Sequence, residues 1–238
     1  MIESSAWPSI WKRHLDGYLK KPARTGFFMD AHFGHVADSF LELGCGSGRD
    51  SVYLARQGHN VVGTDLDGET LNELQQRFAH ESVAFAPADA SALDFPDDSF
   101  DVVFHNGLWV LFEDDAFIER LMAEQARVAR KYAVILVHNA LNPALVERFR
   151  KGAETDELYD IRFFTPDDVR RLVESSGVTY KRQYTLKFGG RFDLLYSAKR
   201  VKRILPNVVW PVRHAAVPRL YQLESWSRVE RVACVVEL

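Results

Sequence analysis

A glycine-rich turn follows a short apolar run in residues 40–50, which read FLELGCGSGRD. Gly44, Gly46 and Gly48 allow the backbone to turn sharply and bring its N–H groups close to a ligand. The spacing is G-x-G-x-G, and a helical pattern opens at Arg49, so the segment predicts a strand, a turn and a helix. The motif is weak evidence by itself, because glycine turns also serve only to end strands.

Polar residues at the ends of the next two β-rich runs strengthen this interpretation. Asp65 ends the run NVVGTD, 21 residues after Gly44, where a carboxylate can accept hydrogen bonds from both hydroxyls of a ribose. Asp89 and Ala90 follow the run Val83–Ala88, and this carboxylate can receive an adenine amino group. Polar stops at the ends of three successive strands therefore predict an adenosine-binding site.

Histidines supply the candidates for acid–base chemistry near this site. His105 ends the fourth β-rich run and His138 ends the fifth. We predict that both face the crevice where the carboxyl ends of parallel strands meet, with His138 as general base and His105 as the second candidate. A packing or hydrogen-bonding role is the alternative for either. His32 and His35, before the first strand, could enter the site from a lid.

The elements that must position these residues follow an alternating order of β-rich runs and helical patterns. This order predicts an α/β fold with a mostly parallel sheet covered on both faces. The predicted strands are Phe40–Leu43, Asn60–Asp65, Val83–Ala88, Phe100–Asn106, Tyr132–His138, Val178–Leu186 and Arg231–Val236. The predicted helices include residues 8–20, Glu113–Lys131 and a helix that begins at Thr165-Pro166 and stops at Gly177.

The composition fits a globular protein. The chain has 238 residues, of which 47% are hydrophobic and 26% charged, which excludes disordered and disulfide-scaffold proteins. No apolar run approaches the roughly 20 residues of a membrane span, and no secretory signal is evident. The two cysteines, Cys45 and Cys234, lie in unrelated contexts, so we expect a cytoplasmic location. The net charge of −3 disfavours nucleic acid as a partner.

Three segments resemble the class I S-adenosylmethionine-dependent methyltransferases, in particular a small bacterial branch. They are ELGCGSGRD at 42–50, GTDLD at 63–67 and PADASALDFPDDSFDVVFHN at 87–106. The resemblance covers about residues 38–198 and the last strand. It implies a Rossmann-like seven-stranded sheet of order 3-2-1-4-5-7-6, with the last strand antiparallel and helices on both faces. It also implies S-adenosyl-L-methionine as the cofactor.

The resemblance assigns donor contacts to individual positions. The glycines would border the methionine and ribose parts, Asp65 would hold the ribose diol, Leu66 would touch the adenine, and His105 and Asn106 would contact the methionine part. The expected donor-binding residues are Glu42, Gly44, Cys45, Gly46, Gly48, Arg49, Asp65, Leu66, Asp89, Ala90, His105 and Asn106. His105 and His138 with Asp89 and Asn139 lack the spacing of a three-ligand metal site, so no metal is predicted.

The acceptor is expected to be a small molecule or a glycan. The fourth strand ends in HNGL rather than in the Asn/Asp-Pro-Pro-aromatic run of related enzymes that methylate nucleic-acid amino groups. We predict transfer to a hydroxyl group of a sugar, glycan or secondary metabolite. The alternatives are N-methylation of an amine metabolite and a non-catalytic partner subunit of the same fold. A nicotinamide-dependent oxidoreductase is disfavoured by the G-x-G-x-G spacing.

A single domain is predicted, with a basic segment near its end. Its parts are a helical cap or lid (1–38), the cofactor-binding core (39–198), a basic insertion (199–228) and the last strand (229–238). Lys199 to Arg231 hold eight Lys or Arg against two Glu, a net charge of +6. This charge favours an anionic acceptor or a weak peripheral membrane contact, and the alternative is a cap with solvated charges. Pro206, Pro211 and Pro218 are expected to prevent one continuous helix.

Overall fold

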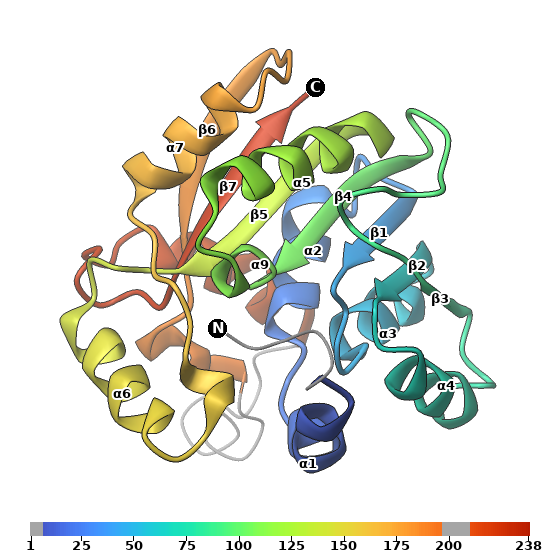
Figure 1. Ribbon diagram of the computed structural model, residues 1–238, viewed down its shortest axis with the longest axis horizontal. Helices are drawn as coiled ribbons and strands as arrows, with labels where there is room; N and C mark the ends of the chain where they lie inside the picture. The colour runs from blue at the N-terminus through green and yellow to red at the C-terminus, as the bar shows by residue number, and fades with distance from the viewer. Residues whose placement is uncertain (1–6, 197–209) are drawn as a thin grey trace.

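A seven-stranded mixed sheet forms the centre of the protein (Figure 1). The computed structural model describes residues 7–196 and 210–238, without the side chains of residues 7, 8 and 210–215. The strand order is β3-β2-β1-β4-β5-β7-β6, and β7 runs antiparallel to both of its neighbours. The predicted fold class, strand order and antiparallel last strand are therefore confirmed.

The elements alternate along the chain as the sequence predicts. The strands are β1 (Ser39–Leu43), β2 (Asn60–Asp65), β3 (Val83–Pro87), β4 (Phe100–Asn106), β5 (Ala129–His138), β6 (Arg182–Phe188) and β7 (Arg231–Glu237). The helices are α1 (Trp7–Leu19), α2 (Arg24–Phe33), α3 (Arg49–Arg56), α4 (Gly68–Arg77), α5 (Asp115–Val128), α6 (Pro143–Ala153), α7 (Pro166–Ser175) and α9 (Trp210–Tyr221). Short 3-10 turns are η2 (Trp109–Leu111), η3 (Glu157–Tyr159) and η4 (Arg191–Tyr196).

The sheet separates two apolar layers, because successive side chains of a strand point to opposite faces. In β5, Val134 and Leu136 pack with residues of α2, α3 and α9, whereas Ile135 and Val137 pack with residues of α5 and α7. The central strands are buried on both faces, as is usual for parallel strands between helices. Figure 1 shows α1 and α6 beyond the carboxyl ends of these strands, where a site is expected.

Several predicted boundaries differ from the structure by one to four residues, and two of them have a clear reason. Helix α5 ends at Val128 rather than at Lys131, because Ala129 already pairs with Phe100 as the first residue of β5. Strand β6 begins at Arg182 rather than at Val178, because its ladder with β7 starts there. Helix α7 begins as predicted, with a reciprocal capping box between the side chains and backbone of Thr165 and Asp168.

Helix α9 corrects the expectation for the prolines. It includes Pro211 and Pro218, so these two residues do not divide the described helix. Pro211 occupies the first turn, where no intrahelical N–H bond is lost, and Pro218 lies within the last turn. Pro206 and the basic residues before position 210 lie outside the described residues, so the expected membrane contact falls there. None of the described helices is long and apolar enough to cross a membrane.

Candidate functional site

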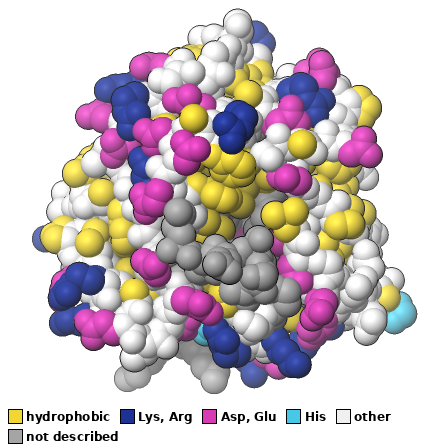
Figure 2. Space-filling view, viewed as in Figure 1, with side chains coloured by type: hydrophobic (Ala, Val, Ile, Leu, Met, Phe, Trp, Pro, Cys, Tyr) yellow, Lys and Arg dark blue, Asp and Glu magenta, His cyan; other side chains and the backbone are white. Residues whose placement is uncertain are grey.

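A cavity of about 1110 Å³ lies at the carboxyl ends of β1, β2, β4 and β5. Pockets for one drug-sized ligand measure roughly 300–1,000 Å³, so this cavity has room for two ligands side by side. Figure 2 shows hydrophobic side chains gathered in the middle of the same face, with charged side chains around them. The cavity has a polar half and an aromatic half, which differ in chemistry.

The polar half of the cavity is lined by Glu42, Gly44, Gly46, Asp65, Leu66 and Asp89. Gly46 and Gly48 have φ angles of 50° and 62°, which side chains with a Cβ rarely adopt. A Cβ on Gly46 would lie 2.2 Å from the Trp11 ring, and one on Gly48 would lie 2.7 Å from the Phe85 ring. Glycine is therefore required at both positions by backbone angle and by space.

Asp65 connects the end of β2 to the glycine turn. Its Oδ2 accepts a hydrogen bond from the Gly46 N–H at 2.9 Å, and its Oδ1 accepts one from the Asp67 N–H at 3.1 Å. Burial raises the pKa of Asp65, and these backbone bonds oppose that shift. A carboxylate offers about four lone-pair sites, so the side chain retains acceptor capacity toward the cavity.

The rim of the polar half contains the residues expected at an adenine. Leu66 is a large apolar side chain that is 64% exposed, and it lines the cavity with Asp89 and Ala90. The Asp89 carboxylate accepts hydrogen bonds from the Ser91 N–H and hydroxyl, both at 2.8 Å. The three residues occupy the positions predicted for them, at the ends of β2 and β3.

The base of the polar half is fixed by buried carboxylates. Glu42 accepts hydrogen bonds from Ser51, at 3.0 Å from its N–H and 2.5 Å from its hydroxyl, and burial beside Asp50 raises the Glu42 pKa. Asp50 accepts a bond from the Gly26 N–H at 2.9 Å, which joins α2 to α3. Arg49 donates to the Tyr18 carbonyl at 3.2 Å and so holds the end of α1 over the turn.

Asn106 supports the fit of the predicted donor. Its Oδ1 is buried at the cavity wall and has no hydrogen-bond partner in the part of the chain that the structure describes. An acceptor in this position suits an ammonium group such as that of a methionine moiety. With the glycine turn, Asp65 and Leu66, the polar half therefore fits an adenosyl-methionine ligand from one end to the other.

His105 does not lie in the cavity, which corrects its prediction as a catalytic and donor-binding residue. Its side chain is fully buried on the opposite face of β4 from Asn106, 5.5 Å from the Trp109 ring centre. Its Nδ1 accepts a bond from the Leu108 N–H at 3.3 Å, and burial lowers its pKa to about 3. His105 is thus a neutral core residue that closes the turn after β4.

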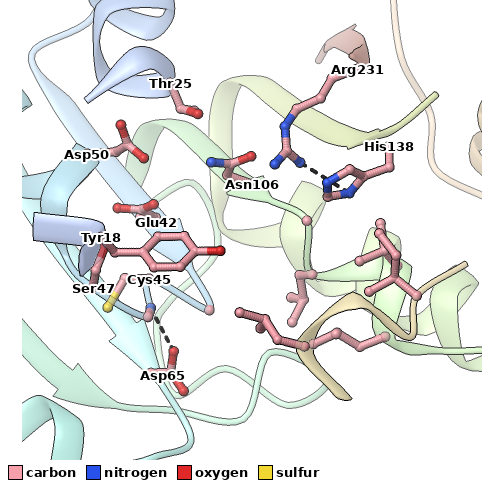
Figure 3. A pocket seen from close by; sticks show the side chains of 18 of the residues that line it. Tyr18, Thr25, Glu42, Cys45, Ser47, Asp50, Asp65, Asn106, His138 and Arg231 are labelled. Atoms are coloured by element: carbon pink, nitrogen blue, oxygen red, sulfur yellow. Dashed lines mark hydrogen bonds between the residues drawn. The ribbon is translucent and has the colours of Figure 1, made fainter. Parts of the chain in front are cut away.

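His138 does lie in the cavity, beside an arginine that the sequence pattern did not single out as a site residue. The Arg231 guanidinium lies 3.5 Å from His138 Nδ1, and Figure 3 shows both side chains opposite Asp65 across the cavity. Burial, with Arg231, Arg148 and Arg24, lowers the pKa of His138 well below its usual value. His138 is therefore uncharged at neutral pH.

The contact with Arg231 fixes the tautomer of His138. A guanidinium only donates hydrogen bonds, so His138 Nδ1 is the acceptor and Nε2 carries the proton. The basic nitrogen of His138 is therefore directed at a cation, and an imidazolium here would face three arginines. This geometry favours a hydrogen-bond donor role for Nε2–H over the predicted role of general base.

The aromatic half of the cavity is lined by Phe112, Phe117, His138, Phe149, Tyr159 and Arg231. His138 packs edge-on against Phe149 at 4.7 Å between ring centres, and Phe149 packs against Tyr159 at 5.2 Å. Phe112 and Phe117 form a further pair at 4.7 Å. Ring faces and edges of this kind suit a flat or branched apolar ligand.

Helix α1 contributes Trp11 and Tyr18 to the lining of the cavity. Tyr18 projects into the cavity between Asp65 and Arg231 (Figure 3). An ion pair of 3.1 Å from Arg13 to Glu157 and a contact of 3.1 Å between His14 Nε2 and Asp156 Oδ2 join α1 to the segment that carries Tyr159. Burial raises the pKa of Tyr18, so its phenol is uncharged at neutral pH.

The remaining candidates lie elsewhere. His32 and His35 do not line the cavity, and His32 Nδ1 instead bonds the Phe28 carbonyl at 2.9 Å. Cys45 lines the cavity as predicted, but burial raises the pKa of its thiol well above its usual value, so it is not a nucleophile. Within residues 7–196 and 210–238, no group of His, Cys, Asp and Glu could hold a metal ion.

The chain is similar to proteins of known family. A family model described as a methyltransferase domain matches residues 40–132. A malonyl-[acyl-carrier protein] O-methyltransferase of Hamiltonella defensa is 28% identical over 72% of this chain and 66% of its own length. The methyltransferase GfsG of Streptomyces halstedii is 30% identical over 63% of this chain and 55% of its own length. The matches thus span less than two thirds of these relatives.

Solved structures share the fold at low sequence identity. A methyltransferase of Thermotoga maritima, titled a possible histamine N-methyltransferase, has a TM-score of 0.61 at 16% identity and covers 96% of this chain and 98% of its own. A 1,6-didemethyltoxoflavin-N1-methyltransferase of Burkholderia thailandensis, with bound S-adenosylhomocysteine, has a TM-score of 0.59 at 19% identity and covers 98% and 85%.

Proposed function

We propose that this chain, which belongs to the class I S-adenosylmethionine-dependent methyltransferases, transfers a methyl group to a hydroxyl group of a small, largely apolar molecule. The observation that carries the proposal is one continuous cavity that joins the polar half to the aromatic half. Methyl transfer needs the two reactants aligned in one water-poor site, and this cavity provides adjacent places for both.

The polar half would hold the donor. Asp65 would accept bonds from the ribose hydroxyls, Leu66 and Ala90 would contact the adenine, and Asn106 Oδ1 would accept from the ammonium group. S-Adenosylmethionine supplies a methyl group that its sulfonium already activates. The protein therefore has to bind and orient the two reactants and exclude water between them. As the new C–O bond forms, the C–S bond of the sulfonium breaks, S-adenosylhomocysteine leaves, and the hydroxyl proton passes to solvent.

The charges of the aromatic half favour a hydroxyl over a protonated amine. Arg24, Arg148 and Arg231 all line the cavity. Glu230, the carboxylate among them, already pairs with Arg24 at 3.0 Å and with Arg148 at 3.5 Å. An ammonium group would add a positive charge to this cluster, which costs electrostatic free energy in a partly buried site.

The transfer can be tested with a methyl-labelled donor. Purified protein is incubated with S-adenosylmethionine labelled in the methyl group and a small-molecule cell extract, and products are separated by charge. We expect label in a neutral or anionic product that resists alkali, as a methyl ether does, and less label with Asp65→Ala. Label in a cationic product would instead indicate N-methylation. Donor binding without any transfer of label would indicate a non-catalytic subunit.

A further inference from the structure

We infer that Arg231 binds a carboxylate of the acceptor, so that the substrate class is a hydroxylated organic acid with an apolar body. This inference rests on the proposed methyl transfer, because it concerns the ligand that lies next to the donor. It is carried by the position of Arg231, its lack of a carboxylate partner among the described residues and the side chains around it.

Arg231 reaches the cavity from the first residue of β7. Because β7 is antiparallel to its neighbours, its first residue pairs with His138 at the end of β5 and with Phe188 at the end of β6. The guanidinium extends over the end of β4, where a Cβ on Gly107 would lie 3.5 Å from Nη1. Figure 3 shows it directed into the space between His138 and Asn106.

The Arg231 guanidinium has no carboxylate within 4.0 Å in the ranges 7–196 and 210–238. The adjacent Glu230 turns away from it to Arg24 and Arg148. Arg24 also forms an ion pair with Asp193. These five groups carry three positive and two negative charges, and the uncompensated positive charge is that of Arg231.

Neighbouring elements do not neutralise this charge. Asp50 of α3 faces the cluster but pairs with Arg49 at 3.4 Å, and Tyr18 of α1 is uncharged at neutral pH. Burial lowers the pKa of Arg231 to about 10, so the guanidinium is still protonated at neutral pH. One unpaired guanidinium suits a singly charged carboxylate, which it can bind with two parallel hydrogen bonds.

The surroundings of Arg231 indicate the body of the ligand. Phe149 and Tyr159 form an aromatic wall next to His138. An acid whose apolar part contacts this wall would direct its carboxylate to Arg231, and its hydroxyl would then face the polar half. The methionine carboxylate of the donor is the competing occupant of Arg231, and the experiment separates the two.

The test uses phenylacetate as a carboxylate probe, 2-phenylethanol as its neutral counterpart and saturating S-adenosylhomocysteine in the polar half. Calorimetry on the full chain should show phenylacetate binding at least tenfold tighter than 2-phenylethanol. Arg231→Met should remove this preference and leave the affinity for S-adenosylhomocysteine within twofold. Arg150→Met, which removes an exposed arginine of α6 that pairs with Glu147 and does not line the cavity, should change phenylacetate affinity by less than threefold.

A second readout guards against misfolding of the Met variant. A carboxylate bound beside Arg231 should raise the pKa of His138 in the unmodified protein, and NMR of the imidazole measures this change. Arg231→Lys, which keeps the positive charge, should retain part of the preference for phenylacetate over 2-phenylethanol. Equal binding of the two probes, or a tenfold loss of S-adenosylhomocysteine affinity in Arg231→Met, would overturn the inference. Tighter binding of phenyl phosphate than of phenylacetate would overturn the assignment of a carboxylate and indicate a phosphate-bearing acceptor instead. Absence of methyl transfer with these binding results intact would overturn only the proposed function.

Discussion

The polar and aromatic halves of the cavity are built in different ways. Most of the polar half comes from one stretch of chain, residues 42–90, in which three strands each end in a polar residue or a glycine turn, and Asn106 is added from the end of β4. The aromatic half combines Phe112, His138, Phe149 and Arg231 from separate elements. Backbone geometry fixes the first, whereas side chains that meet only in the fold define the second. Substitutions in the polar half should therefore change stability and donor binding together. Substitutions in the aromatic half should change which acceptor is bound.

The largest effect is expected from Gly46→Ala. The left-handed backbone and the contact with Trp11 together should cost about 2–5 kcal/mol, as lower stability or as a displaced turn that no longer binds S-adenosylhomocysteine. Denaturant unfolding and calorimetry measure the two outcomes. Gly177→Ala is the matched control, since Gly177 has a φ of 75° but no atom within 4 Å of the position that a Cβ would take. Equal losses in both variants would contradict the role of the Trp11 contact.

Asp65→Ala should weaken binding of S-adenosylhomocysteine by about 1.5–3 kcal/mol, or roughly 10–150-fold. The variant removes the expected bonds to the ribose and the brace on the Gly46 N–H. Asp97→Ala, an exposed acid away from the cavity, serves as the control in the same calorimetry. Unchanged affinity in Asp65→Ala would remove Asp65 from the donor site.

Burial of His105 should make the stability of the protein depend on pH. The folded pKa of His105 is about 3, below the ordinary value, so the unfolded chain binds more protons than the folded one between these values. His105 therefore lowers the free energy of unfolding as the pH falls below about 6.5, by up to about 1.4 kcal/mol per pH unit. His105→Asn should reduce this slope in unfolding measured from pH 7 to 4.5. An unchanged slope in His105→Asn would contradict the contribution of His105 to the pH dependence of stability.

The smallest effect is expected at His138, where turnover of two variants distinguishes a hydrogen-bond donor from a general base. If Nε2–H orients the acceptor, His138→Ala should lower turnover about 3–10-fold, and His138→Gln, which keeps an N–H donor, should recover most of it. If His138 is instead a general base, as the sequence suggested, both variants should lose roughly 100-fold or more. Turnover of the acceptor found with labelled donor gives the comparison, with donor affinity as the control.

The sequence predicts the strands and most of the polar half because their signals are local, whereas the order of the strands in the sheet was implied only by the resemblance to the methyltransferases. Gly44 directly follows β1 and Asp65 is the last residue of β2, so the position of each residue is given by the end of its own strand. The opposite orientations of His105 and His138 were not predictable, since β4 is buried on both faces and shows no alternation of polar residues. Arg231 had a usable signal, because the first residue of an antiparallel strand lies at the carboxyl edge of its parallel neighbours.

The insertion of β7 between β5 and β6 has a consequence for the order of folding. His138 and Arg231 are 93 residues apart, and β7 follows every other strand in the chain. Strands β1 to β4 can pair while synthesis continues, but β6 has its sheet partner only after β7 has entered. A nascent chain can thus complete its glycine turn early, whereas the part of the aromatic half that contains Arg231 forms in the last step of sheet assembly.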